Sequence, residues 1–117
     1  MASIRDLVAA IRQRDGVEAA VILGRDGLLI DSQAIAGLDA EEMAARIPSI
    51  LHAADELGMS SGRGAIVTAV LEHAQGMALI SNLTNEAILL VLLAPNANVG
   101  PLLYELRRNR GQIAALV

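Results

Sequence analysis

Few residues of this 117-residue chain have the types and spacing that chemistry requires. Its only imidazoles are His52 and His73, and it contains no cysteine. Neither histidine has a second ligand at the i+4 spacing that places two metal ligands on one helical face. No Gly-x-Ser-x-Gly elbow marks a nucleophilic serine. The sequence therefore predicts neither a metal site nor an active site.

The loop Gly62-Arg63-Gly64 is the one segment that resembles a phosphate cradle. A P-loop needs a Gly-Lys-Ser/Thr ending, and this chain contains no lysine. A dinucleotide fingerprint would need a third glycine where Val67 stands. We interpret the loop as a flexible linker and expect no cofactor.

Composition narrows the classes of partner. The net charge is −4 and the single aromatic residue is Tyr104, so the basic groove and stacking rings of a nucleic-acid binder are missing. The charge also argues against an anionic membrane, and the N-terminal segment is too charged for a signal peptide. The lack of cysteine fits a cytoplasmic protein. However, 54% of the residues are hydrophobic and the mean hydropathy is +0.48, so we expect the chain to bury apolar surface against a second copy.

The hydrophobic pattern predicts alternating groups of helices and strands. The predicted strand 87–94 contains no polar residue from 87 to 93, so both of its faces should be buried. It should therefore lie in the middle of the sheet, with helices packed on both sides. Short connections between the strands predict antiparallel neighbours. The expected elements are helix 3–14, strands 17–23 and 28–33, helix 39–58, strands 65–72, 77–83 and 87–94, and a helix that starts near 98.

These elements predict a single α+β domain over 1–117, with residues 112–117 as a loosely held tail. The order is α-β-β-α-β-β-β-α, around a five-stranded antiparallel sheet with two helices on one face and one on the other. Asn98 should cap the last helix, and Pro101 should fall in its first turn.

The central helix, 39–58, organises the rest of the chain. Asp39 should cap its start and Gly58 should end it. An apolar stripe at helical spacing should face the sheet, and Pro48 should kink the helix without breaking it. The predicted stripe consists of Met43, Ile47, Ile50, Ala54 and Leu57.

The opposite face of this helix suggests a second packing surface. Ala45, Ser49, His52 and Glu56 form one line, and small residues there would let a second helix approach. A solvated, alanine-rich face explains the same residues about equally well. The five acidic residues of 39–58 could either complement the helix dipole or face a basic partner.

The predicted strand 65–71 is apolar and uncharged, so it would be an aggregation hazard if its edge faced water. Pairing with a second copy would satisfy its open backbone groups. The side chains that we assign to this dimer interface are Ala45, Ser49 and His52 of the helix and Ala65, Val67, Ala69 and Leu71 of the strand.

Several strings at this spacing resemble the roadblock / dynein light chain family, over roughly residues 3–110. They are Gly16-Val17, Arg25-Asp26-Gly27-Leu28, Asp39-Ala40-Glu41-Glu42 and Asn98-Val99-Gly100-Pro101-Leu102-Leu103. The resemblance, to the bacterial branch that includes a gliding-motility GTPase-activating subunit, implies a profilin-like fold. It also implies a homodimer in which the central helices pair and the third strands join two sheets into one of ten strands.

The same resemblance implies a non-catalytic function, in which the dimer binds and regulates a small Ras-like GTPase. Relatives need not insert an arginine finger, so we assign no catalytic role to any arginine. The partner would dock on Glu42, Arg46, Ser49, His52 and Glu56. The alternative is a small-ligand sensory or signalling adaptor, which would need a cavity with convergent polar groups.

Overall fold

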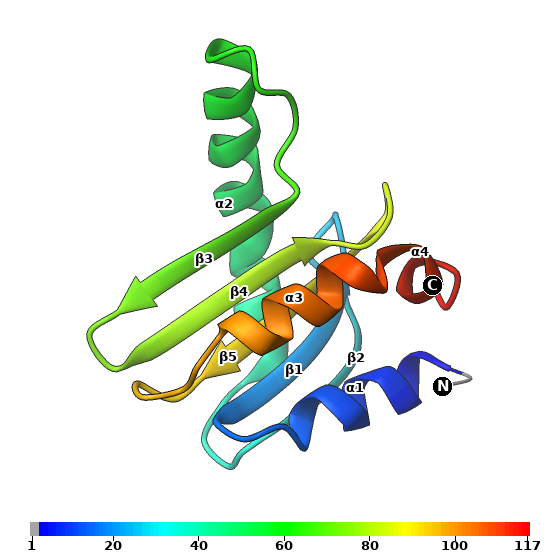
Figure 1. Ribbon diagram of the computed structural model, residues 1–117, viewed down its shortest axis with the longest axis vertical. Helices are drawn as coiled ribbons and strands as arrows, with labels where there is room; N and C mark the ends of the chain where they lie inside the picture. The colour runs from blue at the N-terminus through cyan, green and yellow to red at the C-terminus, as the bar shows by residue number, and fades with distance from the viewer. Residues whose placement is uncertain (1–2) are drawn as a thin grey trace.

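Five antiparallel strands form one sheet, and helices cover both of its faces (Figure 1). The computed structural model describes residues 3–117. The helices are α1 (Ile4–Arg12), α2 (Ala40–Ser60), α3 (Gly100–Arg108) and α4 (Arg110–Ala114). The strands are β1 (Val17–Gly24), β2 (Leu29–Ala34), β3 (Thr68–His73), β4 (Gly76–Asn82) and β5 (Ala87–Leu93).

The strand order is β2-β1-β5-β4-β3, so the wholly apolar strand β5 is central, as its composition predicts. Six of its seven residues are buried. The predicted element order and the antiparallel pairing are confirmed, with α4 as a short addition after α3.

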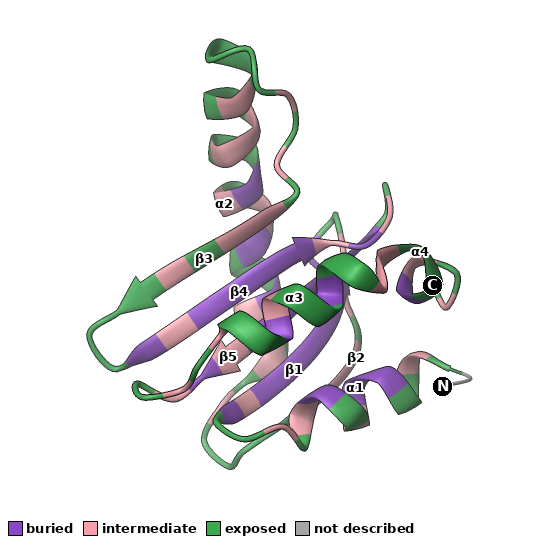
Figure 2. Ribbon diagram, viewed as in Figure 1, coloured by how far each residue is buried: buried purple, intermediate pink, exposed green. Residues whose placement is uncertain are grey.

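Each face of the sheet carries its own core, because successive side chains of a strand point to opposite faces. On one face, Ala20 and Ile22 of β1 pack with α1, α3 and α4. On the other face, Val21 and Leu23 pack beneath α2 alone. Figure 2 shows that most buried residues, drawn in purple, lie on the strands between these two layers of helices. The prediction of α1 and α3 on one face and the long helix on the other is therefore confirmed.

The starts of α1 and α3 are capped in different ways. The Ser3 hydroxyl accepts a 3.2 Å hydrogen bond from the Asp6 amide, so it caps α1 as expected. At α3 the cap position is Val99, one residue after the predicted Asn98. The Asn98 side chain instead accepts from the Gly100 amide at 3.1 Å, which forms a turn that leads into the helix.

Two predicted boundaries also move. The third strand starts at Thr68 rather than at 65, because the backbone of Ile66 bonds to the side chains of Asp55 and Asn82. The sequence predicts a loose tail over residues 112–117, but α4 extends into them and Ile113 is buried against the α1 side of the core. Gly111 suggested that this end of the chain would fray, but the buried side chain of Ile113 holds it in place.

Helix α2 begins as predicted, with the Asp39 carboxylate accepting from the amides of Glu41 and Glu42. The prediction that Gly58 ends it is wrong, since the helix continues to Ser60. Gly58 has another role: a Cβ at this position would lie only 1.9 Å from the carbonyl oxygen of Gly64. It permits the close approach of the chain that returns from α2 toward β3.

The predicted apolar stripe of α2 is partly confirmed, since Ile47 is buried and Met43 and Ile50 are partly buried against the same core. The other buried residues, Ala44 and Leu51, rotate the stripe, and Leu57, assigned to the core from the sequence, is 71% exposed. The helix runs unbroken through Pro48, whose ring lies 3.2 Å from the position that a Cβ on Gly27 would take. Pro48 therefore covers the β1–β2 turn, where a glycine with φ of 87° leaves room for its ring.

Candidate protein-interaction surface

Helix α2 is too long for the sheet it covers. Its 21 residues span about 31 Å at 1.5 Å per residue, whereas five strands are only about 19 Å across. Figure 1 shows the C-terminal part of α2 projecting beyond the β3 edge, with the connection 61–67 running back beside it. We call residues 52–60, the part of α2 that follows its last buried residue, Leu51, the overhang.

Large apolar side chains are exposed on the overhang and along the nearby edge. On the overhang, Leu57 is 71% and Met59 is 64% exposed. Val67, just before β3, is 50% exposed, and Val70 within β3 is 41% exposed. Four such residues on neighbouring segments indicate a protein-interaction surface. Leu57, Met59 and Val70 are absent from the interface predicted from sequence, although the length of the apolar helix was a signal that pointed to an overhang.

The predicted line on the outer face of α2 is present. Ala45, Ser49, His52 and Glu56 are all exposed and follow one another at helical spacing. Beside Ala45, Arg46 forms an ion pair with Glu42 at 3.4 Å, and His52 Nε2 lies 3.1 Å from Glu56 Oε1. All four of these charged or ionisable side chains are at least 64% exposed. Such exposed pairs contribute little to stability, so their groups are available to a partner.

The outer edge of β3 offers unpaired backbone groups. The backbone N–H of Asn82 donates to the Val67 carbonyl at 2.9 Å, and from there the β3–β4 register continues without a shift. Because inward and outward residues alternate along an antiparallel strand, three residues of β3 direct their N–H and C=O groups away from β4. These residues are Thr68, Val70 and Glu72.

The side chains predicted for this strand lie in different environments. Ala65 is exposed and Val67 is half-exposed, and both precede β3 itself. Ala69 and Leu71 are partly buried against the core beneath α2. The exposed surface of this segment therefore consists mainly of backbone groups and of the side chains of Val67 and Val70.

The opposite edge of the sheet, β2, is less open. The amide of Ser32, which the same alternation directs outward, is bonded to the Asp31 carboxylate at 2.9 Å. A charged residue that turns back on the edge is a known way to discourage strand addition. The outward amide of Ser32 is thus occupied within its own chain, although Ile30 on the same strand is 50% exposed.

A polar network attaches the overhang to the sheet. Asp55 of α2 accepts from the Ile66 amide at 2.8 Å and from Arg25 at 3.4 Å. Arg25 also donates to the side-chain oxygen of Asn82 at 2.9 Å, and the side-chain NH2 group of Asn82 donates to the Ile66 carbonyl at 2.6 Å. Four segments that are distant in the sequence meet here. The network fixes the overhang and the start of β3 relative to each other.

Within residues 3–117, no three acidic or histidine side chains gather as a metal ion would require. Across the same residues, every helix is too short or too polar to cross a membrane.

Comparisons with known proteins agree with this architecture. The family model described as the Roadblock/LC7 domain matches residues 4–93. The uncharacterized protein MJ0310 of Methanocaldococcus jannaschii is 27% identical over 106 residues, which are 91% of this chain and 92% of that protein.

Among solved structures, a Roadblock/LC7 domain from Streptomyces avermitilis superposes with a TM-score of 0.83 at 22% identity, covering 95% of this chain and 94% of that one. MglB of Myxococcus xanthus also gives 0.83, at 13% identity, covering 97% of this chain and 95% of that one. At such identities these structures are similar in fold.

Proposed function

Because the chain belongs to the Roadblock/LC7 domain family, we propose that it is a homodimeric regulator or scaffold, without catalysis of its own, that binds a small Ras-like GTPase. We infer from the family resemblance that the partner is a GTPase. The dimer is supported by the geometry of the chain, and the rest of the proposal depends on it.

The observation that carries the proposal is the overhang beside the open β3 edge. A single copy leaves Leu57, Met59 and Val70 in water, together with the outward backbone groups of β3. A second copy related by a two-fold axis would cover the apolar side chains and pair the two β3 strands. An obligate interface on the order of 2,000 Å² would be in the normal range.

Pairing of the overhangs would place two copies of the exposed α2 line close to the two-fold axis. The partner-binding residues that we propose are Glu42, Arg46, Ser49, His52 and Glu56. Ala45, Ser49 and His52 would lie where the two helices approach each other. Helix α2 and its cap carry five acidic residues against Arg46, so the platform would suit a basic surface on the partner.

Two measurements test the proposal in order. Sedimentation at micromolar concentration should give the mass of a dimer, and a stable single subunit would contradict the dimer. Capture experiments from the native cytosol, with GTP and GDP compared, should then retrieve a small GTPase in a nucleotide-dependent way. A dimer that captures no GTPase in either state would contradict the regulatory function while leaving the assembly intact.

The alternative is a small-ligand sensory or signalling adaptor of profilin-like fold. One observation favours it: a pocket opens on the face of the sheet away from α2, between α1 and α3–α4. Co-purification of a bound metabolite would support this function.

A further inference from the structure

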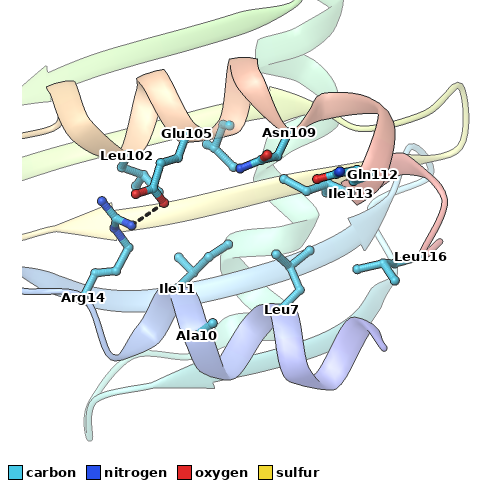
Figure 3. A pocket seen from close by; sticks show the side chains of 11 residues that line it. Leu7, Ala10, Ile11, Arg14, Leu102, Glu105, Asn109, Gln112, Ile113 and Leu116 are labelled. Carbon is cyan, nitrogen blue, oxygen red and sulfur yellow. Dashed lines mark hydrogen bonds and ion pairs between the residues drawn. The ribbon is translucent and has the colours of Figure 1, made fainter. Parts of the chain in front are cut away.

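A pocket of about 490 Å³ separates α1 from α3 and α4 (Figure 3). This volume is within the range of small-molecule sites, roughly 300–1,000 Å³. The pocket lies on the layer opposite α2, so neither the proposed dimer nor the proposed GTPase platform uses it. Its occupant would be independent of both.

The floor and walls of this pocket are aliphatic. The floor residues are between 2% and 7% exposed and belong to the buried core of this layer. These residues are Leu7, Ile11, Leu102, Leu106 and Ile113. No aromatic ring lines the pocket, and Ala10 of α1 contributes only a methyl group to its wall. A thin, flexible hydrocarbon chain fits such a space better than a planar ring or a helix.

Polar groups gather at the rim. Arg14, just after α1, donates to the Glu105 carboxylate of α3 at 2.6 Å, which closes one end of the pocket. The side-chain amides of Asn109 and Gln112 also reach the rim, and among the lining residues Figure 3 marks only the Arg14–Glu105 interaction. Glu105 is 55% exposed, so it can release Arg14 and remain solvated.

The charge around the pocket has a definite sign. Segments 3–16 and 100–117, which supply this layer of helices, contain six arginines and three acidic residues, a net charge of +3. Residues 39–60 on the other layer contain five acidic residues and one arginine, a net charge of −4. The potential near the rim therefore favours an anionic group.

We propose that this pocket binds a single-chain aliphatic molecule with an anionic head group, of the fatty-acid class. The chain lies against Leu7, Ile11 and Leu106. The head group bonds to Arg14 in place of Glu105, and the amides of Asn109 and Gln112 are within reach of it.

The test uses the full chain and decanoate below its micelle-forming concentration, with binding followed by calorimetry and by the NMR signals of the methyl groups. We expect saturable binding to one site per chain, with shifts in the methyl signals of the floor residues. Decanol should bind more weakly, and the decyltrimethylammonium cation should bind least. Absence of binding, or shifts centred on Leu57 and Met59, would overturn the proposal.

Variants separate a binding site from a mere gap between helices. Ala10→Phe should fill the pocket and weaken decanoate binding by about tenfold or more, whereas the matched variant Ala10→Ser should bind as the original chain does. Equal binding by both variants would refute the site. Should Ala10→Phe fail to fold, Asn109→Asp at the rim provides the test, because its carboxylate should repel the head group.

The ion pair gives the sharpest result, since its two partners should have opposite effects. Arg14→Gln should weaken decanoate binding by about tenfold, with little effect on decanol. Glu105→Gln should strengthen decanoate binding, because it frees Arg14. If the ion pair only holds α1 to α3, both variants will change binding in the same direction, and the assignment of the head group to Arg14 is then wrong.

Discussion

The carboxylate of Asp55 accepts a 2.8 Å hydrogen bond from the backbone amide of Ile66, eleven residues further along the chain. This bond joins the overhang of α2 to the segment that enters β3. The other oxygen of Asp55 accepts from Arg25 at 3.4 Å, so the same carboxylate also contacts the β1–β2 turn. The two parts of the proposed dimer interface, helix and strand edge, are held in one orientation by this aspartate.

Replacing Asp55 should destabilise the chain and its dimer together. Asp55→Ala leaves the Ile66 amide without its partner, and we expect a loss of about 1–3 kcal/mol in the free energy of unfolding. Urea denaturation at a fixed protein concentration measures it. The neighbouring Glu56→Ala, which removes only an exposed contact, should stay within about 0.5 kcal/mol. Equal effects of the two variants would show that the network contributes nothing.

A glycine pair tests the close approach at the end of α2. Alanine normally favours a helix by about 1 kcal/mol over glycine. At Gly58, however, its Cβ would meet the Gly64 carbonyl oxygen at 1.9 Å, so Gly58→Ala should destabilise by about 1–3 kcal/mol. At Gly111 in α4, no atom lies within 4 Å of the same position, so Gly111→Ala should be neutral or stabilising. Thermal unfolding should move in opposite directions for the two variants, and a shared sign would contradict the geometry.

Proline substitutions on the two edge strands, β3 and β2, test which edge pairs with a second copy of the chain. The amide of Thr68 points away from β4, so Thr68→Pro removes an outward donor and no bond within the chain. We expect monomers or aggregates from Thr68→Pro, and also from Val67→Asp, in sedimentation at micromolar concentration. Ala34→Pro makes the corresponding change on β2 and should remain dimeric. Loss of the dimer only in Ala34→Pro would place the interface on the other edge.

Two leucines of α2 should separate folding from assembly. Leu51 is 3% exposed, and Leu51→Ala should cost about 2–5 kcal/mol of stability. Leu57 is 71% exposed, so Leu57→Ser should leave the fold of each subunit intact and should weaken the dimer. Light scattering across a dilution series would detect this weakening. An unchanged dissociation constant would remove the overhang from the interface.

Charge reversal on the α2 line tests the partner surface. The double variant Glu42→Arg and Glu56→Arg should remain dimeric, because both side chains are exposed and their ion pairs are weak. It should reduce capture of the proposed GTPase, since like charges would then face a basic surface. The same double change at Asp6 and Asp15, exposed residues on or just after α1 in the layer opposite α2, serves as the control. Equal capture by both variants would move the docking site elsewhere.

Much of this protein follows from its sequence through local rules. The period of the apolar residues specifies the helices and strands, because a helix repeats every 3.6 residues and a strand every two. The unbroken apolar run of β5 requires cover on both faces and therefore a central place in the sheet. Asp39 and Ser3 cap their helices through bonds to amides only two or three residues away.

Contacts between distant segments set the features that local rules missed. Leu57 follows the apolar period of α2, yet it is exposed because the helix is longer than the sheet is wide. Gly58 looks like a helix stop, but its role is set by the returning chain at Gly64. Strand β3 begins late because Asp55 and Asn82 bind the backbone before it. No local pattern encodes where an element meets a partner far along the chain, and that is why the interaction surface needed the fold to define it.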